Sequence, residues 1–211
     1  VLTDVLKSYS VDTNQLFLAG SSNGGMGTIY FGTRLPDRFA GLAANMGYPV
    51  VDRRFLEQPQ NLEVLQNLSH ARVFLSHGSR DDTVTPQGDR DTADRLRKAD
   101  GSVVLREWPG KGHNLDIREV IDDILEVFAT GRRNPYPRHI DFVLTDPAYS
   151  RCFWLEVEGA PAGAEVHARI TDNTIEVQAV SVGRLRLYLD EKLVDLARDV
   201  VVRVNGRESF R

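Results

Sequence analysis

The sequence predicts an α/β fold, with a parallel sheet covered by helices on both faces, followed by a small all-β unit. Over residues 1–130, short apolar runs alternate with amphipathic helical patterns, which is typical of a parallel sheet. A polar, proline-containing segment over residues 131–138 indicates a linker. Over residues 139–211 the hydrophobic period becomes two, which indicates strands and favours a β-sandwich-like domain. We therefore expect two domains joined by that linker.

The first part of the chain is expected to hold strands that alternate with helices. Its strands are short apolar runs of the kind that a parallel sheet buries on both faces, and they cover residues 15–19, 39–46, 72–76 and 103–107. Helical patterns cover residues 1–9, 26–33, 62–68, 86–99 and 115–128. In the first helix Leu2, Val5 and Leu6 share one face of an amphipathic pattern. In the last helix the apolar residues in register on one face are Ile117, Ile121, Leu125 and Phe128.

The second part is expected to contain about six strands that alternate with period two. They cover residues 139–143, 153–157, 166–170, 174–180, 185–189 and 200–204. Turn signals such as Asn205-Gly206 separate them, and Cys152 is expected in the core. Four aromatic residues have two interpretations, either core and edge packing or a platform that binds carbohydrate or substrate. They are Tyr149, Phe153, Trp154 and Tyr188.

Composition excludes several classes of protein. The chain has 211 residues, of which 41% are hydrophobic and 27% charged, so it can bury a core and is not expected to be disordered. A formal net charge of −4 argues against a nucleic-acid partner. No apolar run approaches the ~20 residues that span a bilayer.

Metal and disulfide sites are not expected either. The single cysteine rules out an intramolecular disulfide and a cysteine-rich zinc site. The histidines His70, His139 and His167 share no metal-ligand spacing. We therefore expect neither a metal nor an organic cofactor.

The strongest chemical signal is the run Gly20–Gly25 (GSSNGG), which follows the first apolar strand and precedes a helix. In this context Gly-x-Ser-x-Gly is a nucleophile-elbow pattern, in which a strand turns sharply into a helix. The flanking glycines remove side chains that would collide across the turn. Ser22 would then project above the sheet, and the N–H of Asn23 would point to where an oxyanion binds. A glycine-rich turn is the alternative, and Ser21 is a weaker nucleophile because Ala19 stands two residues before it.

Two further signals follow the third and the fourth strand. The loop over residues 77–84 carries Asp81 and Asp82, either of which could orient a catalytic histidine or serve as a turn or cap residue. The loop over residues 109–114 carries His113 between glycine and asparagine. This histidine could reach across the top of the sheet or lie exposed in its loop.

Taken together, Ser22, Asp81 and His113 point to nucleophilic catalysis. They follow the chain order serine, acid, histidine, and each lies at the carboxyl end of an expected strand. Because the carboxyl ends of parallel strands share one edge, these side chains can meet. The order belongs to the α/β-hydrolase arrangement and not to the chymotrypsin or subtilisin arrangements. His77, by contrast, is expected to be a structural residue at its strand end.

These motifs carry a resemblance to the α/β-hydrolase superfamily. Residues 1–128 resemble the C-terminal half of such a catalytic domain, and are most similar to bacterial esterases and to the prolyl oligopeptidase family. The resemblance implies Ser22 in GSSNGG as nucleophile, Asp81 in HGSRDDTV as acid and His113 in GKGHN as base. It makes Asp82 the weaker acid, because the family places the acid four residues after the histidine of its His-Gly pair. The run SNGGM also resembles polyester- and feruloyl-esterase sequences, which favours an ester.

The resemblance also implies parts that lie outside this sequence. A full domain of this type has four or more strands ahead of the nucleophile strand, and one of its early loops donates a second oxyanion N–H. No residue of this chain can be assigned that role. We therefore expect a longer parent protein, or a second polypeptide, to complete the sheet beside residues 15–19.

We expect a serine hydrolase that cleaves a carboxylic ester by acyl transfer, with a small-molecule ester or a peptide as substrate. A serine peptidase of the prolyl oligopeptidase type is the alternative reaction. A non-catalytic binding module that keeps a degenerate hydrolase half is the alternative of a different class. Residues 47–70 are a candidate lid. The sequence leaves the compartment open, and export would suit a bacterial hydrolase of this type.

Overall fold

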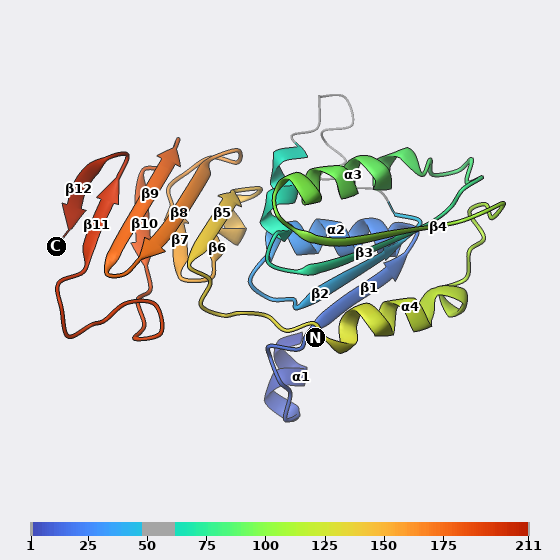
Figure 1. The fold of residues 1–211 in the computed structure, drawn as a ribbon, viewed down its shortest axis with the longest axis horizontal. Coiled ribbons are helices and arrows are strands. Elements are labelled where there is room, and N and C mark those ends of the chain that lie inside the picture. The colour runs from blue at the N-terminus through green and yellow to red at the C-terminus, as the bar shows by residue number, and fades with distance from the viewer. Residues whose placement is uncertain (1, 48–61, 211) are drawn as a thin grey trace.

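The computed structural model describes residues 2–47 and 62–210, and its first part is a parallel sheet with helices (Figure 1). The four strands lie side by side in the order β1-β2-β3-β4, all parallel. This arrangement confirms the predicted α/β class. The elements are α1 (Leu2–Ser8), β1 (Phe17–Ser21), α2 (Asn23–Arg34), β2 (Gly41–Asn45), η2 (Leu62–Leu68), β3 (Arg72–Gly78), α3 (Gln87–Lys98), β4 (Ser102–Trp108) and α4 (Ile117–Ala129).

Helices cover both faces of this sheet because alternate residues of its strands point to opposite sides. Leu42 of β2 and Leu75 of β3 pack with residues of α2, η2 and α3. Their neighbours Ala43 and Phe74 pack on the other face with residues of α4. All four side chains are buried, so the inner strands read as continuous apolar runs in the sequence.

Two helix faces differ from the expectation. Helix α1 buries none of its residues, and Leu2 and Val5 are each 39% exposed. In α4 the buried residues are Val120 and Ile124, whereas Ile121 and Leu125 are exposed. The prediction for α4 is confirmed for Ile117 and Phe128, which pack against the core, and wrong for Ile121 and Leu125, because the apolar residues of this helix occupy two neighbouring stripes. The sheet takes the stripe with spacings of three and four residues.

The second part of the chain consists of two further sheets that share one core. A five-stranded mixed sheet has the order β12-β11-β9-β8-β5, and an antiparallel sheet has the order β10-β7-β6. The expectation of six strands was too low, because the short β6 and the last strand β12 were missed. The elements are β5 (His139–Val143), η3 (Pro147–Tyr149), β6 (Arg151–Cys152), β7 (Leu155–Glu158), β8 (Glu165–Thr171), β9 (Thr174–Val180), β10 (Arg184–Leu187), β11 (Val201–Val204) and β12 (Arg207–Phe210).

Of the two interpretations of the aromatic residues in this part, the structure supports core packing for Phe153 and Trp154. Phe153 and Trp154 are buried in the shared core, next to Cys152, which is buried as expected. The indole N–H of Trp154 donates a 2.6 Å hydrogen bond to the carbonyl of Pro137 and so fixes the segment that precedes β5. The hydroxyl of Tyr188 donates to a carboxylate oxygen of Glu156 across the three-stranded sheet.

The two parts meet at η2, which lies between the parallel sheet and β5 (Figure 1). The side chain of Asn67 in η2 bonds to Thr33 on one side and to Val143 of β5 on the other. The division into domains at residues 130 and 139 remains a prediction. The candidate lid over residues 47–70 includes residues 48–61, which lie outside the described part of the chain.

No helix among the described residues is long and apolar enough to cross a membrane.

Candidate active site

Ser22 stands at the turn between β1 and α2 and has a positive φ. Its φ is 54° and its ψ is −117°, which is a strained region for a residue with a Cβ. A Cβ added at Gly20 would lie 2.2 Å from the carbonyl oxygen of Gly24. The first glycine of the motif is therefore required for α2 to begin directly over the end of β1.

A buried asparagine that the sequence analysis did not single out holds this turn. The backbone N–H of Ser22 donates to the carbonyl of Asn45 at the end of β2. The Asn45 side-chain amide donates to the hydroxyl of Ser21 and to the carbonyl of Leu115, and its oxygen accepts from the hydroxyl of Ser76. Asn45 is fully buried, so one side chain ties together β1, β2, β3 and the segment before α4.

Asp81 lies in the loop after β3 and is buried. One carboxylate oxygen accepts the backbone N–H groups of Thr83 at 3.0 Å and Val84 at 2.9 Å. Burial on its own would raise the pKa of Asp81, but the hydrogen bonds from Val84, His113 and Thr83 outweigh it, and the pKa lies below its ordinary value. The carboxyl group is therefore held as a carboxylate at neutral pH.

The loop that carries His113 is bonded to the loop that carries Asp81. The N–H of Arg80 donates to the carbonyl of Lys111 at 2.8 Å, and the N–H of Gly110 donates to the hydroxyl of Ser79 at 3.0 Å. The two loops approach so closely that a Cβ at Gly78 would lie 2.5 Å from the carbonyl oxygen of Lys111. The glycine of the His-Gly pair is thus explained by this contact.

The structure brings together the three side chains that the sequence analysis selected. The hydroxyl oxygen of Ser22 lies 2.8 Å from Nε2 of His113. Nδ1 of His113 lies 2.7 Å from the second carboxylate oxygen of Asp81. The His113 side chain is 23% exposed and that of Asp81 is not exposed at all. His113 is therefore accessible from the solvent, and Asp81 lies in the interior behind it.

The two weaker candidates lie elsewhere. Asp82 is exposed, and its neighbour Asp81 is the acid in contact with His113. The hydroxyl of Ser21 accepts from Asn45. Trp108, at the end of β4, packs against the core between the sheet and α4.

Asn23 is the first residue of α2 and is exposed. The first N–H groups of a helix have no intrahelical acceptor and lie at the positive end of the helix dipole. An oxyanion formed at a carbonyl on Ser22 could therefore accept the N–H of Asn23. The described residues supply no assignable second donor for it.

A second histidine–aspartate pair is buried behind Asp81. His77, the strand-end residue, has Nδ1 2.7 Å from a carboxylate oxygen of Asp89 in the first turn of α3. His77 and Asp89 are both completely buried, which agrees with the structural role expected for His77. Asp89 was missed because an aspartate near the start of a helix normally reads as an exposed cap.

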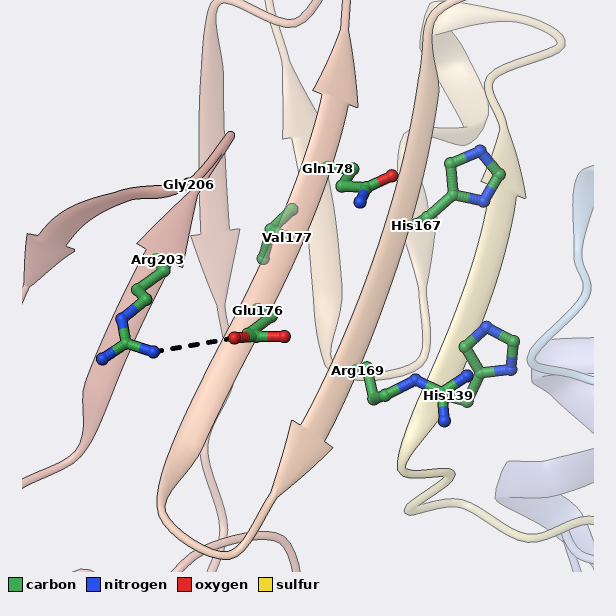
Figure 2. Close-up of a pocket in the computed structure, with 8 residues that line it drawn as sticks. All are labelled: His139, His167, Arg169, Glu176, Val177, Gln178, Arg203 and Gly206. Carbon is green, nitrogen blue, oxygen red and sulfur yellow. Dashed lines mark ion pairs between the residues drawn. The ribbon is translucent and has the colours of Figure 1, made fainter.

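The outer face of the five-stranded sheet carries a separate polar pocket of about 350 Å³. Figure 2 shows its side chains, which project from β5, β8, β9 and β11. They include His139, His167, Arg169, Glu176, Gln178 and Arg203. Among them, Glu176 forms an ion pair with Arg203 at 3.6 Å.

Two histidines of this pocket face one aspartate, which their sequence spacing did not reveal. Nδ1 of His167 lies 2.6 Å and Nε2 of His139 lies 3.1 Å from different oxygens of Asp141. These ring nitrogens point at carboxylate oxygens and not at a common central point. No group of three or more histidine, cysteine, aspartate or glutamate residues in the described ranges is arranged to hold a metal ion.

Comparison with known proteins identifies the first part of the chain. Residues 2–128 match the sequence profile of a family described as phospholipase/carboxylesterase. A search of curated proteins finds no significant match.

Among the solved structures that match this part of the chain, two illustrate the fold that they share with it. A thermostable esterase superposes with a TM-score of 0.53 at 17% identity, over 63% of this chain and 35% of its own. A protein described as a dipeptidyl aminopeptidase IV from Bacteroides ovatus superposes with a TM-score of 0.51 at 20% identity, over 61% of this chain and 21% of its own. The chain thus corresponds to about a third and about a fifth of the lengths of these two proteins.

Proposed function

Because this chain belongs to the phospholipase/carboxylesterase family of α/β-hydrolases, we propose that it is a serine hydrolase whose active centre is Ser22, His113 and Asp81. The observation that carries the proposal is the unbroken chain of two hydrogen bonds, 2.8 Å from Ser22 to His113 and 2.7 Å from His113 to Asp81. The strained turn at Ser22 supports it, because such strain persists where the surrounding structure imposes it.

In this reaction the hydroxyl oxygen of Ser22 attacks the substrate carbonyl carbon while Nε2 of His113 takes the proton. Asp81 accepts the Nδ1–H of His113, which fixes the tautomer and stabilises the imidazolium cation. The tetrahedral intermediate collapses, its bond to the leaving group breaks, and His113 returns the proton to that group. Water, deprotonated by His113, then attacks the acyl-enzyme, releases the acid and restores the Ser22 hydroxyl.

The N–H of Asn23 is proposed as one of the two oxyanion donors. Its place at the start of α2, directly after the nucleophile, supports this role. The second donor would come from the partner segment described below. Loss of one such donor typically lowers kcat by about 10²–10³.

A fluorophosphonate probe tests the nucleophile directly, because it reacts only with an activated serine. We expect the wild-type protein to be labelled, Ser22→Ala to lose all label, and Ser21→Ala to keep it as the matched control. Label that persists on Ser22→Ala would show that another residue is the nucleophile. Absence of label on the wild type would instead favour the alternative of a non-catalytic binding module.

We propose a carboxylic ester as the substrate and a peptide as the alternative. An alkoxide or phenoxide leaves with little protonation, whereas an amine must be protonated as it leaves. An ester therefore demands less proton transfer from His113 than a peptide does. The test compares a p-nitrophenyl ester with the p-nitroanilide of the same acyl group. A higher kcat/KM for the ester supports the proposal, and a higher value for the anilide contradicts it.

We also propose that the sheet continues beyond β1, through an upstream segment or a second polypeptide. In the described chain β1 pairs only with β2. Apolar side chains of α1 and α4 are also exposed, Leu2 and Val5 on one helix and Ile121 and Leu125 on the other. If the added segment brings the second oxyanion donor, it should speed labelling of Ser22 by about 10²–10³. An unchanged rate in the extended protein would contradict this.

A further inference from the structure

His77 and Asp89 form a buried pair that the proposed reaction does not use. Nδ1 of His77 lies 2.7 Å from a carboxylate oxygen of Asp89, and neither side chain has exposed surface. His77 comes from β3 and Asp89 from the first turn of α3. A buried pair of ionisable groups costs desolvation free energy, and apolar residues of similar size would often serve stability better. The pair therefore calls for a reason other than stability.

The other nitrogen of the His77 ring faces two acceptors. Nε2 lies 2.8 Å from the carbonyl oxygen of Val84 and 3.1 Å from a carboxylate oxygen of Asp81. Neither oxygen can donate a hydrogen bond when Asp81 is ionised, so Nε2 carries a proton. The ring thus donates to the carbonyl of Val84, and its Nε2–H, which carries a partial positive charge, lies beside Asp81.

This assignment places another proton between His77 and Asp89. Their 2.7 Å contact is a hydrogen bond only if one proton lies in it, on the imidazole or on the carboxyl group. The second oxygen of Asp89 is buried and has no partner among the described residues. The other charged side chains that act on Asp89 are the carboxylates of Glu107 on β4 and Asp81, and Glu107 pairs with Arg90 of α3 at 2.6 Å and 2.8 Å. Among the described residues, the hydrogen-bond partner of the Asp89 carboxyl group is therefore His77.

Val84 connects this pair to the active centre. Its N–H donates to one oxygen of Asp81, and its carbonyl accepts from His77. The same residue is thus held at both of its backbone polar groups, by the proposed catalytic acid and by the pair behind it. A shift of the His77 ring would move the loop that sets the direction of the Asp81 carboxylate.

We propose that His77, held by Asp89, is a positioning residue for the proposed active centre. Through the carbonyl of Val84 and its contact with Asp81, it keeps the second oxygen of Asp81 on Nδ1 of His113. This inference rests on the proposed function, since it assigns Asp81 as the acid that orients His113. It adds Asp89 and His77 to the residues on which the rate depends, although neither touches the substrate.

Variants of Asp89 of nearly equal size provide the first test. Asp89→Asn can still donate to Nδ1 of His77 through its amide, so we expect kcat to stay within about threefold of the wild type. Asp89→Leu leaves His77 without a partner, and we expect kcat to fall by about 10- to 100-fold with KM nearly unchanged, since small misplacements of catalytic groups can cost that much. A folded Asp89→Leu variant with wild-type kcat would overturn the proposal.

A spectroscopic test separates this inference from the proposed function. The proton on Nδ1 of His113 gives a deshielded NMR resonance when it is bonded to Asp81, whether or not the protein turns over substrate. We expect this resonance to persist in Asp89→Asn and to be lost or shifted upfield in Asp89→Leu. His167→Gln, which disrupts the histidine–aspartate pair on the outer sheet, should leave it unchanged. A wild-type resonance in Asp89→Leu would overturn the proposal even if the probe labels Ser22.

The protonation of the His77 ring can be measured on the wild-type protein, so this test does not depend on whether a variant folds. Nitrogen-15 chemical shifts report which ring nitrogen of His77 carries a proton. We expect Nε2 to be protonated at neutral pH, as its two oxygen neighbours require. An unprotonated Nε2 would overturn the proposal, because the ring could then neither donate to Val84 nor face ionised Asp81. Missing fluorophosphonate label with a protonated Nε2 would count against the proposed hydrolase alone.

Discussion

Asp81 and Asp82 are adjacent carboxylates of the same type, and only their surroundings distinguish them. Asp81 is buried, accepts two backbone N–H groups and faces His113, whereas Asp82 is exposed. If Asp81 fixes the tautomer of His113, an amide at this position would offer an N–H where an acceptor is needed. Replacing the Asp81 carboxylate by an amide should therefore lower the catalytic rate and leave substrate binding unchanged.

We therefore expect Asp81→Asn to lower kcat by about 10⁴ while KM changes little. Asp82→Asn is the matched control and should retain the wild-type kcat. Steady-state kinetics with a p-nitrophenyl ester measure both. Equal losses in the two variants would show that the loop, and not the Asp81 carboxylate, is what matters.

The buried pair behind Asp81 should be visible in the pH dependence of stability. Burial raises the pKa of Asp89 to about 6, although the hydrogen bond from His77 acts against it. For His77, burial lowers the pKa, but the hydrogen bond and charge of Asp89, the hydrogen bond to Val84 and the charge of Asp81 together raise it more, and the net direction is upward. Both groups thus bind protons more tightly in the folded state than in the unfolded chain, and their contribution to stability is lost as pH rises.

We expect this loss to be absent in Asp89→Asn. For Asp89 the stabilisation is complete below about pH 4 and is lost by about pH 6, and a shift of about two pKa units corresponds to ~3 kcal/mol. For His77 it is present below its unfolded pKa and is lost as pH rises through its folded pKa. Urea unfolding from pH 4 to 8 should therefore show the wild type losing stability relative to Asp89→Asn. A constant difference across that range would contradict the assignment.

The turn from β1 into α2 determines whether Ser22 can take the position of a nucleophile. A Cβ at Gly20 would lie 2.2 Å from the backbone oxygen of Gly24, and backbone cannot yield as a side chain can. At Gly27, inside α2, an added Cβ meets nothing within 4 Å. The same substitution should thus have opposite effects seven residues apart.

We expect Gly20→Ala to remove fluorophosphonate labelling and to lower the melting temperature strongly. Gly27→Ala should raise stability by about 0.5–1 kcal/mol, because alanine loses less conformational freedom in a helix than glycine. Thermal unfolding and labelling of both variants measure this. A stable, labelled Gly20→Ala protein would mean that the turn can relax, and the account of the first motif glycine would fail.

The sequence predicted the alternation of strands and helices well, because that signal is local. The β5 strand and the β9 strand were predicted with the bounds that the structure has. The three candidate residues were found because glycine-flanked motifs at strand ends are also local. Asn45 and Asp89 were missed because their roles depend on partners from other elements, and polar residues with distant partners look the same in a sequence as exposed ones.

Asn67 joins the two parts of the molecule, and its local sequence does not predict this role. It lies in the 3-10 helix η2 and is 1% exposed. Its amide donates to the carbonyls of Thr33 and Val143 at 2.8 Å and 2.9 Å, and its oxygen accepts the N–H of Val143 at 2.8 Å. Val143 is 76 residues away in the sequence. One asparagine therefore links the parallel sheet layer to the first strand of the β part.

We expect Asn67→Ala to separate the unfolding of the two parts. The change leaves three buried backbone groups without partners, at a cost of about 2–4 kcal/mol in the free energy of unfolding. Asn173→Ala is the matched control, since Asn173 also makes three hydrogen bonds to backbone, but at an exposed site within the β part. Calorimetry should show one transition for the wild type and Asn173→Ala, and two for Asn67→Ala. A single unshifted transition in Asn67→Ala would mean that apolar contacts alone join the two parts, and that the buried asparagine only fills space between them.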